Sequence, residues 1–172
     1  MIRATIAETR AFESWQDYQD ALKRAIAPLT DEQLQQRPLP ELRTPGEIAE
    51  HIVFGRALHL HRLLGEAAAE LIPLHRWDDD DLPRTAVEII QGLDLTWQFI
   101  IDCLMGGSPT DDLTEQEAEV VQTIWGLLDH DLPHAGELSL LLGAAGLCHS
   151  AGWHNGVLPP QGAGNGARLG RA

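Results

Sequence analysis

The 172-residue sequence has no long hydrophobic run, few basic residues and only two cysteines. No stretch approaches roughly 18 uncharged apolar residues, and the first residues lack the apolar segment of a secretory signal. We therefore expect a cytoplasmic protein that does not enter a membrane. Cys103 and Cys148 are isolated in the sequence, which is typical of reduced, small apolar residues rather than of a structural disulfide.

Basic side chains are outnumbered by acidic ones, 12 to 26, and the formal net charge is −14. This charge repels phosphate backbones, and no window concentrates lysine and arginine into a basic patch. Nucleic acid is therefore excluded as an expected ligand. With 44% hydrophobic residues, a chain of this length is able to bury the core of a single domain.

Motifs of several enzyme classes are also missing. The sequence has no H-E-x-x-H motif, no paired Glu-x-x-His motifs of a carboxylate-bridged two-iron bundle, and no G-x-S-x-G nucleophile turn. It has no glycine-rich phosphate-binding loop between a strand and a helix. These absences leave histidine chemistry as the main candidate.

Apolar residues recur every three or four positions in four segments, a spacing that places them on one face of a helix. Thr-x-x-Glu capping boxes begin three of these segments, at Thr44, Thr85 and Thr114. No segment of useful length alternates as a strand does. The sequence therefore predicts an all-α four-helix bundle, with helices over about residues 11–28, 44–65 or 69, 85–106 and 114–143.

Three other features refine this prediction. Pro133 removes a backbone donor inside the last helix, so we expect a bend there. The acidic run 77–81 is interpreted as a solvated loop, because four adjacent carboxylates cannot converge on one ion. Residues 155–172 are rich in glycine and proline and predict a flexible tail, which assigns the bundle to residues 1–154.

The histidines supply the clearest chemical pattern. His130 and His134 are four residues apart, so on a helix they share one face and can reach one ion at about 2.0–2.1 Å. His51 shares an apolar stripe on the second helix, and Gly55 one turn later leaves room beside it. Three such imidazoles would leave a coordination position open, as in catalytic metal sites.

Alternative interpretations of the same histidines stand beside this one. A histidine pair four residues apart also arises by chance, and a single histidine on an apolar face is more often a hydrogen-bonded core residue than a ligand. The remaining histidines are predicted to lie at the surface (His59, His61 and His75) or to follow the last helix, from where they could fold over the site (His149 and His154).

A metal-bound imidazole normally donates its second ring N–H to a carboxylate or a carbonyl oxygen. The acidic residues near the candidate ligands are Glu47, Asp129, Asp131 and Glu137. Glu47 is better explained by its capping box with Thr44.

Three segments together resemble the DinB/YfiT-like family: Thr44–Ile52, Ile124–Ser139 and Leu142–Leu147. The resemblance extends over roughly residues 8 to 148. It implies a four-helix bundle, often a homodimer, that holds a divalent metal ion, zinc or nickel in many members, through three histidines. The matching positions are His51, His130 and His134. Pro133 and Ala135 depart from the family pattern without removing a ligand.

The resemblance implies several reactions rather than one. Some family members transfer low-molecular-weight thiols to electrophiles and others are thiol-dependent isomerases. The leading hypothesis is a thiol-dependent S-transferase or metal-dependent hydrolase acting on a small molecule, with the thiol supplied as cosubstrate because no cysteine is placed as a nucleophile. The alternatives are a non-catalytic, metal-stabilised, stress-associated bundle and an interaction module without metal. Segments 30–43, 66–84 and 106–122 are expected to be loops around the site.

Overall fold

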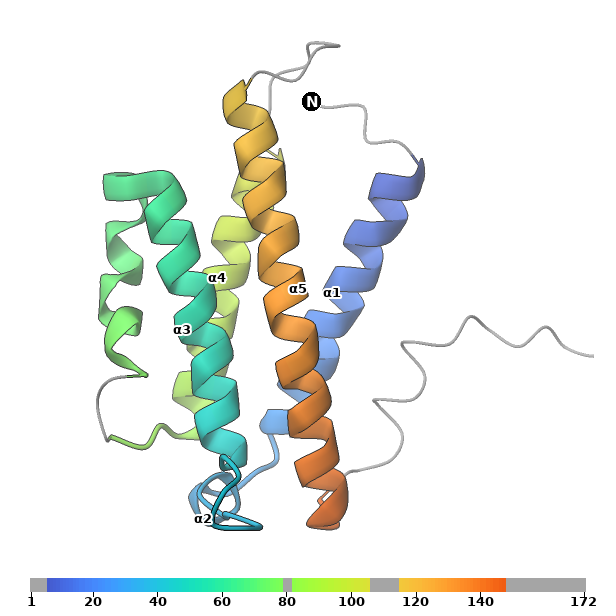
Figure 1. The fold of residues 1–172 in the computed structure, drawn as a ribbon, viewed down its shortest axis with the longest axis vertical. Helices are drawn as coiled ribbons and strands as arrows, with labels where there is room; N and C mark the ends of the chain where they lie inside the picture. The colour runs from blue at the N-terminus through green and yellow to red at the C-terminus, as the bar shows by residue number, and fades with distance from the viewer. Residues whose placement is uncertain (1–5, 79–81, 106–114, 148–172) are drawn as a thin grey trace, which may run out of the picture.

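The computed structural model describes residues 6–78, 82–105 and 115–147, which contain helices and connecting segments but no strand (Figure 1). This confirms the all-α prediction. The elements are α1 (Ile6–Ile26), α2 (Asp31–Leu34), α3 (Pro45–Leu64), a 3₁₀ segment η1 (Gly65–Arg76), α4 (Ala86–Met105) and α5 (Glu115–Ala144). Within the described part of the chain, no helix combines the length and apolar character needed to cross a membrane.

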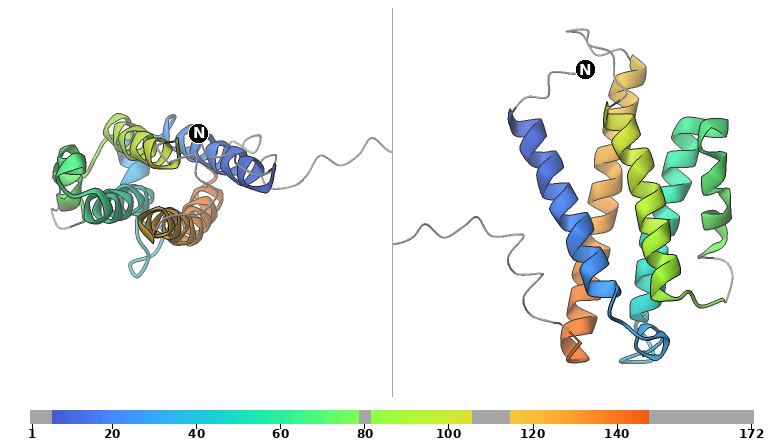
Figure 2. Two further views of the ribbon diagram at one scale, coloured as in Figure 1. Left: turned by 90° about the horizontal axis from the view of Figure 1, so that it is seen from above. Right: turned by 180° about the vertical axis from the view of Figure 1, so that it is seen from behind.

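The four long helices α1, α3, α4 and α5 form the bundle that the periodicity predicts. α3 packs against α5, α4 and η1, while α1 packs against α4. Viewed from above, α3 and α5 lie on one side of the bundle and α1 and α4 on the other, with η1 outside α3 (Figure 2). Residues of α3 and α5 therefore face each other over much of their length.

Capping boxes begin two of the long helices as predicted. The Thr44 side chain accepts a hydrogen bond from the backbone N–H of Glu47 at 3.1 Å, and the Glu47 carboxylate accepts one from the backbone N–H of Thr44 at 2.7 Å. Thr85 and Glu88 form the same reciprocal pair ahead of α4. The third predicted box, at Thr114, lies outside the described residues. These bonds satisfy backbone donors that have no partner inside the helix.

α3 ends at Leu64, because the next residue, Gly65, has a φ of +57°, which lies outside the right-handed helical region. The longer alternative, ending at Ala69, is therefore wrong. After Gly65 the chain folds back along α3 and buries Ala68, Leu71 and Leu74. These residues are three apart, and residues at that spacing share one face of a 3₁₀ helix.

Two segments predicted to be loops contain helical structure. Residues 65–76 form η1, and a short helix, α2, lies within 30–43. Thr30 and Gln33 form the capping box of α2. Both elements escape a search for long runs with a period of 3.6, because one has a period of three and the other is a single turn.

Pro133 lies inside α5 without ending it. The helix continues from Glu115 to Ala144, and the proline ring is exposed. Proline has no backbone N–H group, so one backbone hydrogen bond of the helix is lost at this position. The bend expected there stays a prediction.

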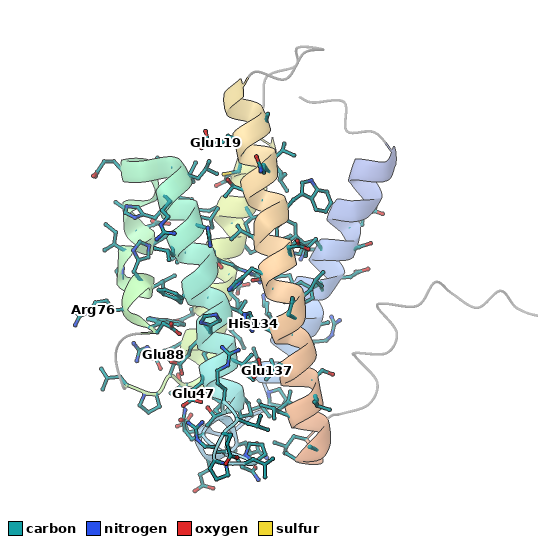
Figure 3. All side chains as sticks on the ribbon, in the orientation of Figure 1. Glu47, Arg76, Glu88, Glu119, His134 and Glu137 are labelled. Carbon is teal, nitrogen blue, oxygen red and sulfur yellow. The ribbon has the colours of Figure 1, made fainter. Side chains whose placement is uncertain are left out.

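The capping box of α4 leads to a prediction about Glu88, which is labelled in Figure 3. Hydrogen bonds from the backbone and the side chain of Thr85 lower the pKa of Glu88. A lowered pKa in the folded state stabilises the fold above the unfolded value of about 4.5, and this contribution disappears as the pH falls through the lowered value. Glu88→Gln should therefore cost a few tenths to about 1 kcal/mol at pH 7 and much less near pH 3.

Urea unfolding of the unsubstituted protein and of Glu88→Gln, at neutral and at acidic pH, measures the difference in their free energies of unfolding. Asp102→Asn is the control, since Asp102 is an exposed carboxylate at the other end of α4. An equal cost of Glu88→Gln at both pH values would contradict the assignment.

Candidate metal centre

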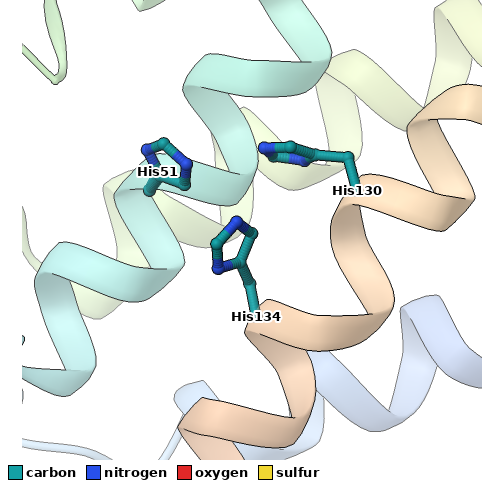
Figure 4. A group of neighbouring side chains, drawn as sticks. All are labelled: His51, His130 and His134. Atoms are coloured by element: carbon teal, nitrogen blue, oxygen red, sulfur yellow. The ribbon is translucent and has the colours of Figure 1, made fainter.

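The three histidines singled out in the sequence lie together between α3 and α5 (Figure 4). The His51 ring centroid is 5.3 Å from that of His130 and 4.7 Å from that of His134, and the latter two centroids are 4.8 Å apart. One ring nitrogen from each residue lies within 4.8 Å of the other two. The cluster is therefore compatible with metal binding.

The separation of the ring nitrogens can be compared with the geometry of a bound zinc ion. Nitrogen ligands bind zinc at about 2.0–2.1 Å, so two ligands of one ion lie no more than about 4.2 Å apart. The three rings are all partly buried, and the separation of their nitrogens, within 4.8 Å, is close to that limit. Three imidazoles are a donor set that zinc, nickel and copper all accept.

Gly55 makes room for the His130 ring. A Cβ atom at this position would lie 2.4 Å from Cε1 and 3.0 Å from Nε2 of His130. Real Cβ atoms do not approach other atoms to 2.4 Å, so any side chain at position 55 displaces the ring. The space that the sequence suggested beside His51 is in fact filled by the imidazole from the opposite helix.

Each of the three histidines has a carboxylate near its Nδ1 atom. A carboxylate only accepts hydrogen bonds, so a ring that donates Nδ1–H to it leaves Nε2 free as a ligand atom. The pairs are His51 with Asp78 (3.0 Å), His130 with Asp131 (3.2 Å) and His134 with Glu137 (3.6 Å).

Asp131 and Glu137 were among the acidic partners expected from the sequence. Glu47, labelled in Figure 3, forms its capping box and an ion pair with Arg37 instead, and Asp129 is exposed. Asp78 was missed. Asp78 is exposed and lies in the turn after η1, as the interpretation of the run as a solvated loop predicts, but folding of η1 against α3 also brings it to His51. The rest of the run, 79–81, lies outside the described residues.

Arg43 is a second site residue that the sequence did not reveal. Its Nη2 atom lies 3.1 Å from His134 Nδ1 and 2.8 Å from the Glu137 carboxylate. A guanidinium group only donates, so His134 Nδ1 accepts here. If His134 bound an ion through Nε2, its ring proton would be on Nδ1. The Glu137 carboxylate is the group positioned to accept a hydrogen bond from that Nδ1–H. His134 is therefore the candidate ligand that would have to exchange its outer partner.

The charge state of His134 suits ligation. Burial lowers its pKa, and the neighbouring His130, His51 and Arg43 lower it further, against a smaller opposite effect of Glu137. A lowered pKa keeps the imidazole neutral at neutral pH, and only the neutral ring binds a metal ion.

The other described histidines are not part of this cluster, although the His59 ring centroid lies 6.5 Å from that of His130. His59 is exposed, as predicted. His61 and His75 are half-buried with ring centroids 4.9 Å apart, and His75 Nε2 lies 3.3 Å from the Ala57 carbonyl oxygen. Their predicted surface position is confirmed only in part, because η1 covers this part of α3 and leaves each side chain partly exposed.

No described cysteine is suited to act as the nucleophile. Cys103 is a free, half-buried thiol packed against the core, and burial raises its pKa. A raised pKa disfavours the reactive thiolate. Cys148, His149 and His154 lie outside the described residues.

A helical bundle with three histidines converging between two helices defines a protein with a candidate metal centre. A family model described as the DinB superfamily matches residues 14–138, a range that contains all three histidines. The chain therefore belongs to the DinB superfamily, which confirms the resemblance seen in the sequence. Searches of curated proteins and of solved structures returned no match.

The tight fit at Gly55 leads to a prediction. Gly55→Ala should displace the His130 ring and weaken the binding of zinc by about 10- to 100-fold, the range seen when support of a ligand histidine is lost. The helix itself should tolerate alanine, which is favoured over glycine by about 1 kcal/mol. Zinc affinity is measured by competition with a chromophoric chelator, and folding by circular dichroism.

Gly126→Ala is the matched control. Gly126 lies on α5 one turn before His130, and a Cβ atom there meets nothing within 4 Å. This variant should keep the affinity of the unsubstituted chain. Equal affinities of the two variants would show that the space at Gly55 does not position His130.

Proposed function

We propose that the protein binds one divalent metal ion through the Nε2 atoms of His51, His130 and His134 and uses it as an enzyme. The proposed activity is that of a thiol-dependent S-transferase or a metal-dependent hydrolase acting on a small molecule. The observation that carries the proposal is the convergence of three imidazoles, each with a carboxylate near its Nδ1 atom.

Zinc and nickel are the proposed ions. Neutral imidazole nitrogen suits both, whereas calcium and magnesium prefer oxygen ligands. Three protein ligands leave at least one position for water or substrate, the arrangement of catalytic rather than structural zinc sites. A bound divalent ion supplies Lewis acidity, which lowers the pKa of a coordinated thiol or water so that its anion is available near neutral pH.

The residues around the cluster have separate tasks in this proposal. Asp78 and Asp131 orient the rings of His51 and His130 by accepting their Nδ1–H groups. Arg43 is partly exposed beside His134 and offers N–H donors to an anionic group of a substrate. The nucleophilic thiol is a cosubstrate, because Cys103 is held in the protonated form.

The expected homodimer and cytoplasmic location, and the division at residue 154, also remain proposals. The dimer is supported by apolar side chains that α5 exposes to solvent, among them Trp125, Leu132 and Leu140. Exposed apolar residues of this size gathered on one helix are a common feature of surfaces that contact another chain.

Metal content tests the first part of the proposal. Protein purified without an affinity tag and reconstituted with zinc should contain close to one ion per chain by elemental analysis. His51→Ala, His130→Ala and His134→Ala should each lose most of it, because removing a ligand of a three-histidine site removes a third of its protein bonds.

His59→Ala is the control, since it removes an exposed histidine of α3 whose ring centroid lies 6.5 Å from that of His130 but which is not part of the cluster. It should retain the ion. A reconstituted chain with close to no metal would reject the proposed site.

Turnover tests the second part. The zinc- and nickel-loaded protein is combined with common low-molecular-weight thiols and a panel of electrophiles and esters. Turnover in one pairing should exceed that of the metal-free chain and should disappear in His134→Ala but persist in His59→Ala. Absence of turnover in every pairing, together with a higher melting temperature of the metal-loaded chain, would instead support the non-catalytic, metal-stabilised bundle.

A further inference from the structure

A buried ion pair lies directly behind the metal centre. Arg56 of α3 donates from Nε to Asp131 of α5 at 2.6 Å, and neither side chain has any exposed surface. The second carboxylate oxygen of Asp131 lies 3.2 Å from Nδ1 of His130. The same carboxylate therefore contacts an arginine in the core and a candidate ligand at the site.

Consecutive residues on two helices make up this arrangement. On α3, Gly55 leaves the space that the His130 ring occupies, and Arg56 holds the carboxylate next to that ring. On α5, His130 and Asp131 are also adjacent in sequence. Gly55 and Arg56 thus both affect the position of His130. Gly55 leaves space for its ring, and Arg56 acts through Asp131.

Arg56 is held from its other end by the rest of the bundle. Its Nη1 atom donates to Gln19 of α1 at 2.7 Å, and the Gln19 amide donates to the Leu93 carbonyl of α4 at 3.2 Å. Tyr18 of α1 donates to the backbone carbonyl of Asp131 at 3.4 Å. All four long helices contribute to the position of Asp131.

Stability alone is a poor explanation for this network. Burying an ion pair costs desolvation energy that its attraction often fails to exceed, and apolar residues of similar volume are frequently as stable. Arg56 Nη2 also lacks a hydrogen-bond partner among the described residues, and an unpaired buried donor is destabilising. A role beyond packing would account for keeping both charges in the core.

We propose that Arg56 and Asp131 are positioning residues of the metal centre, which fix His130 with its proton on Nδ1 so that Nε2 faces the ion. A carboxylate that accepts from a guanidinium group at 2.6 Å also accepts from its other neighbour, so His130 must donate. A carboxylate or carbonyl behind a ligand histidine sets its tautomer and orientation in this way. The inference rests on the proposed metal binding by His130.

The first test replaces the ion pair without leaving a single charge in the core. Arg56→Met combined with Asp131→Val is neutral overall and close in volume, so the metal-free chain should still fold. Its zinc affinity should fall by about 10- to 100-fold, and the visible spectrum of its cobalt-loaded form should differ from that of the unsubstituted protein. A folded double variant with unchanged affinity and spectrum would overturn the proposal.

The matched control is Lys23→Met with Asp94→Val. This pair joins α1 to α4 by an ion pair at the surface, with side chains 31% and 50% exposed. Its removal should leave zinc affinity and the cobalt spectrum unchanged. A loss equal to that of the core variant would mean that any ion pair in the bundle has the same effect, which would also overturn the proposal.

The second test uses the unsubstituted, metal-free chain and does not depend on the double variant folding. Nitrogen NMR of the histidine rings above their pKa should show His130 with its proton on Nδ1, although the free imidazole prefers Nε2–H. A proton on Nε2 would overturn the inference. Failure of the chain to bind zinc would reject the proposed function, whereas the tautomer would still report the bond to Asp131.

Discussion

The ion pair of Arg56 and Asp131 fixes the alignment of α3 and α5, on which the geometry of the histidine cluster depends. It joins α3 to α5 where no water reaches it, and through Gln19 and Tyr18 it also involves α1. A buried charge without its partner is strongly unfavourable, so the facing positions of α3 and α5 cannot slide relative to each other without breaking this bond. The same register brings His51 opposite His130 and His134. The pair that aligns α3 with α5 therefore also aligns the residues of the histidine cluster.

The three candidate ligands differ in how far they are prepared for an ion. His51 and His130 face carboxylates at Nδ1, which favours the tautomer with a free Nε2. His134 instead accepts from Arg43, and its carboxylate Glu137 is 3.6 Å away. Arg43 and Glu137 already pair with each other, so exchange of the outer partner at His134 needs a shift of one guanidinium group rather than a rearrangement of helices. Only His130 is held through the core, because its partner Asp131 is fully buried, whereas the carboxylates beside His51 and His134 are 44% and 33% exposed.

Much of the fold and the three histidines could be predicted from the sequence because both depend on local spacing. Capping boxes and a period of 3.6 identified the long helices, and the separation of four residues placed His130 beside His134. Asp78 and Arg43 could not be found in this way, since they lie on connecting segments whose paths depend on tertiary contacts. The spacing of three at Ala68, Leu71 and Leu74 was a signal for η1 that went unused. Because η1 returns the chain along α3, missing it also meant missing the partner of His51.

Asp131 illustrates a different limit of sequence reasoning. Its position next to His130 made it one of four acidic neighbours, and nothing in the spacing separated it from Asp129. The structure separates them by burial, since Asp131 is fully enclosed while Asp129 is exposed. What places Asp131 inside is a residue 75 positions away, Arg56, which is itself unusual because an arginine with no exposed surface needs an acidic partner. An arginine on the apolar face of a predicted helix, next to the glycine that the site requires, is therefore the sequence feature that would have pointed to this carboxylate.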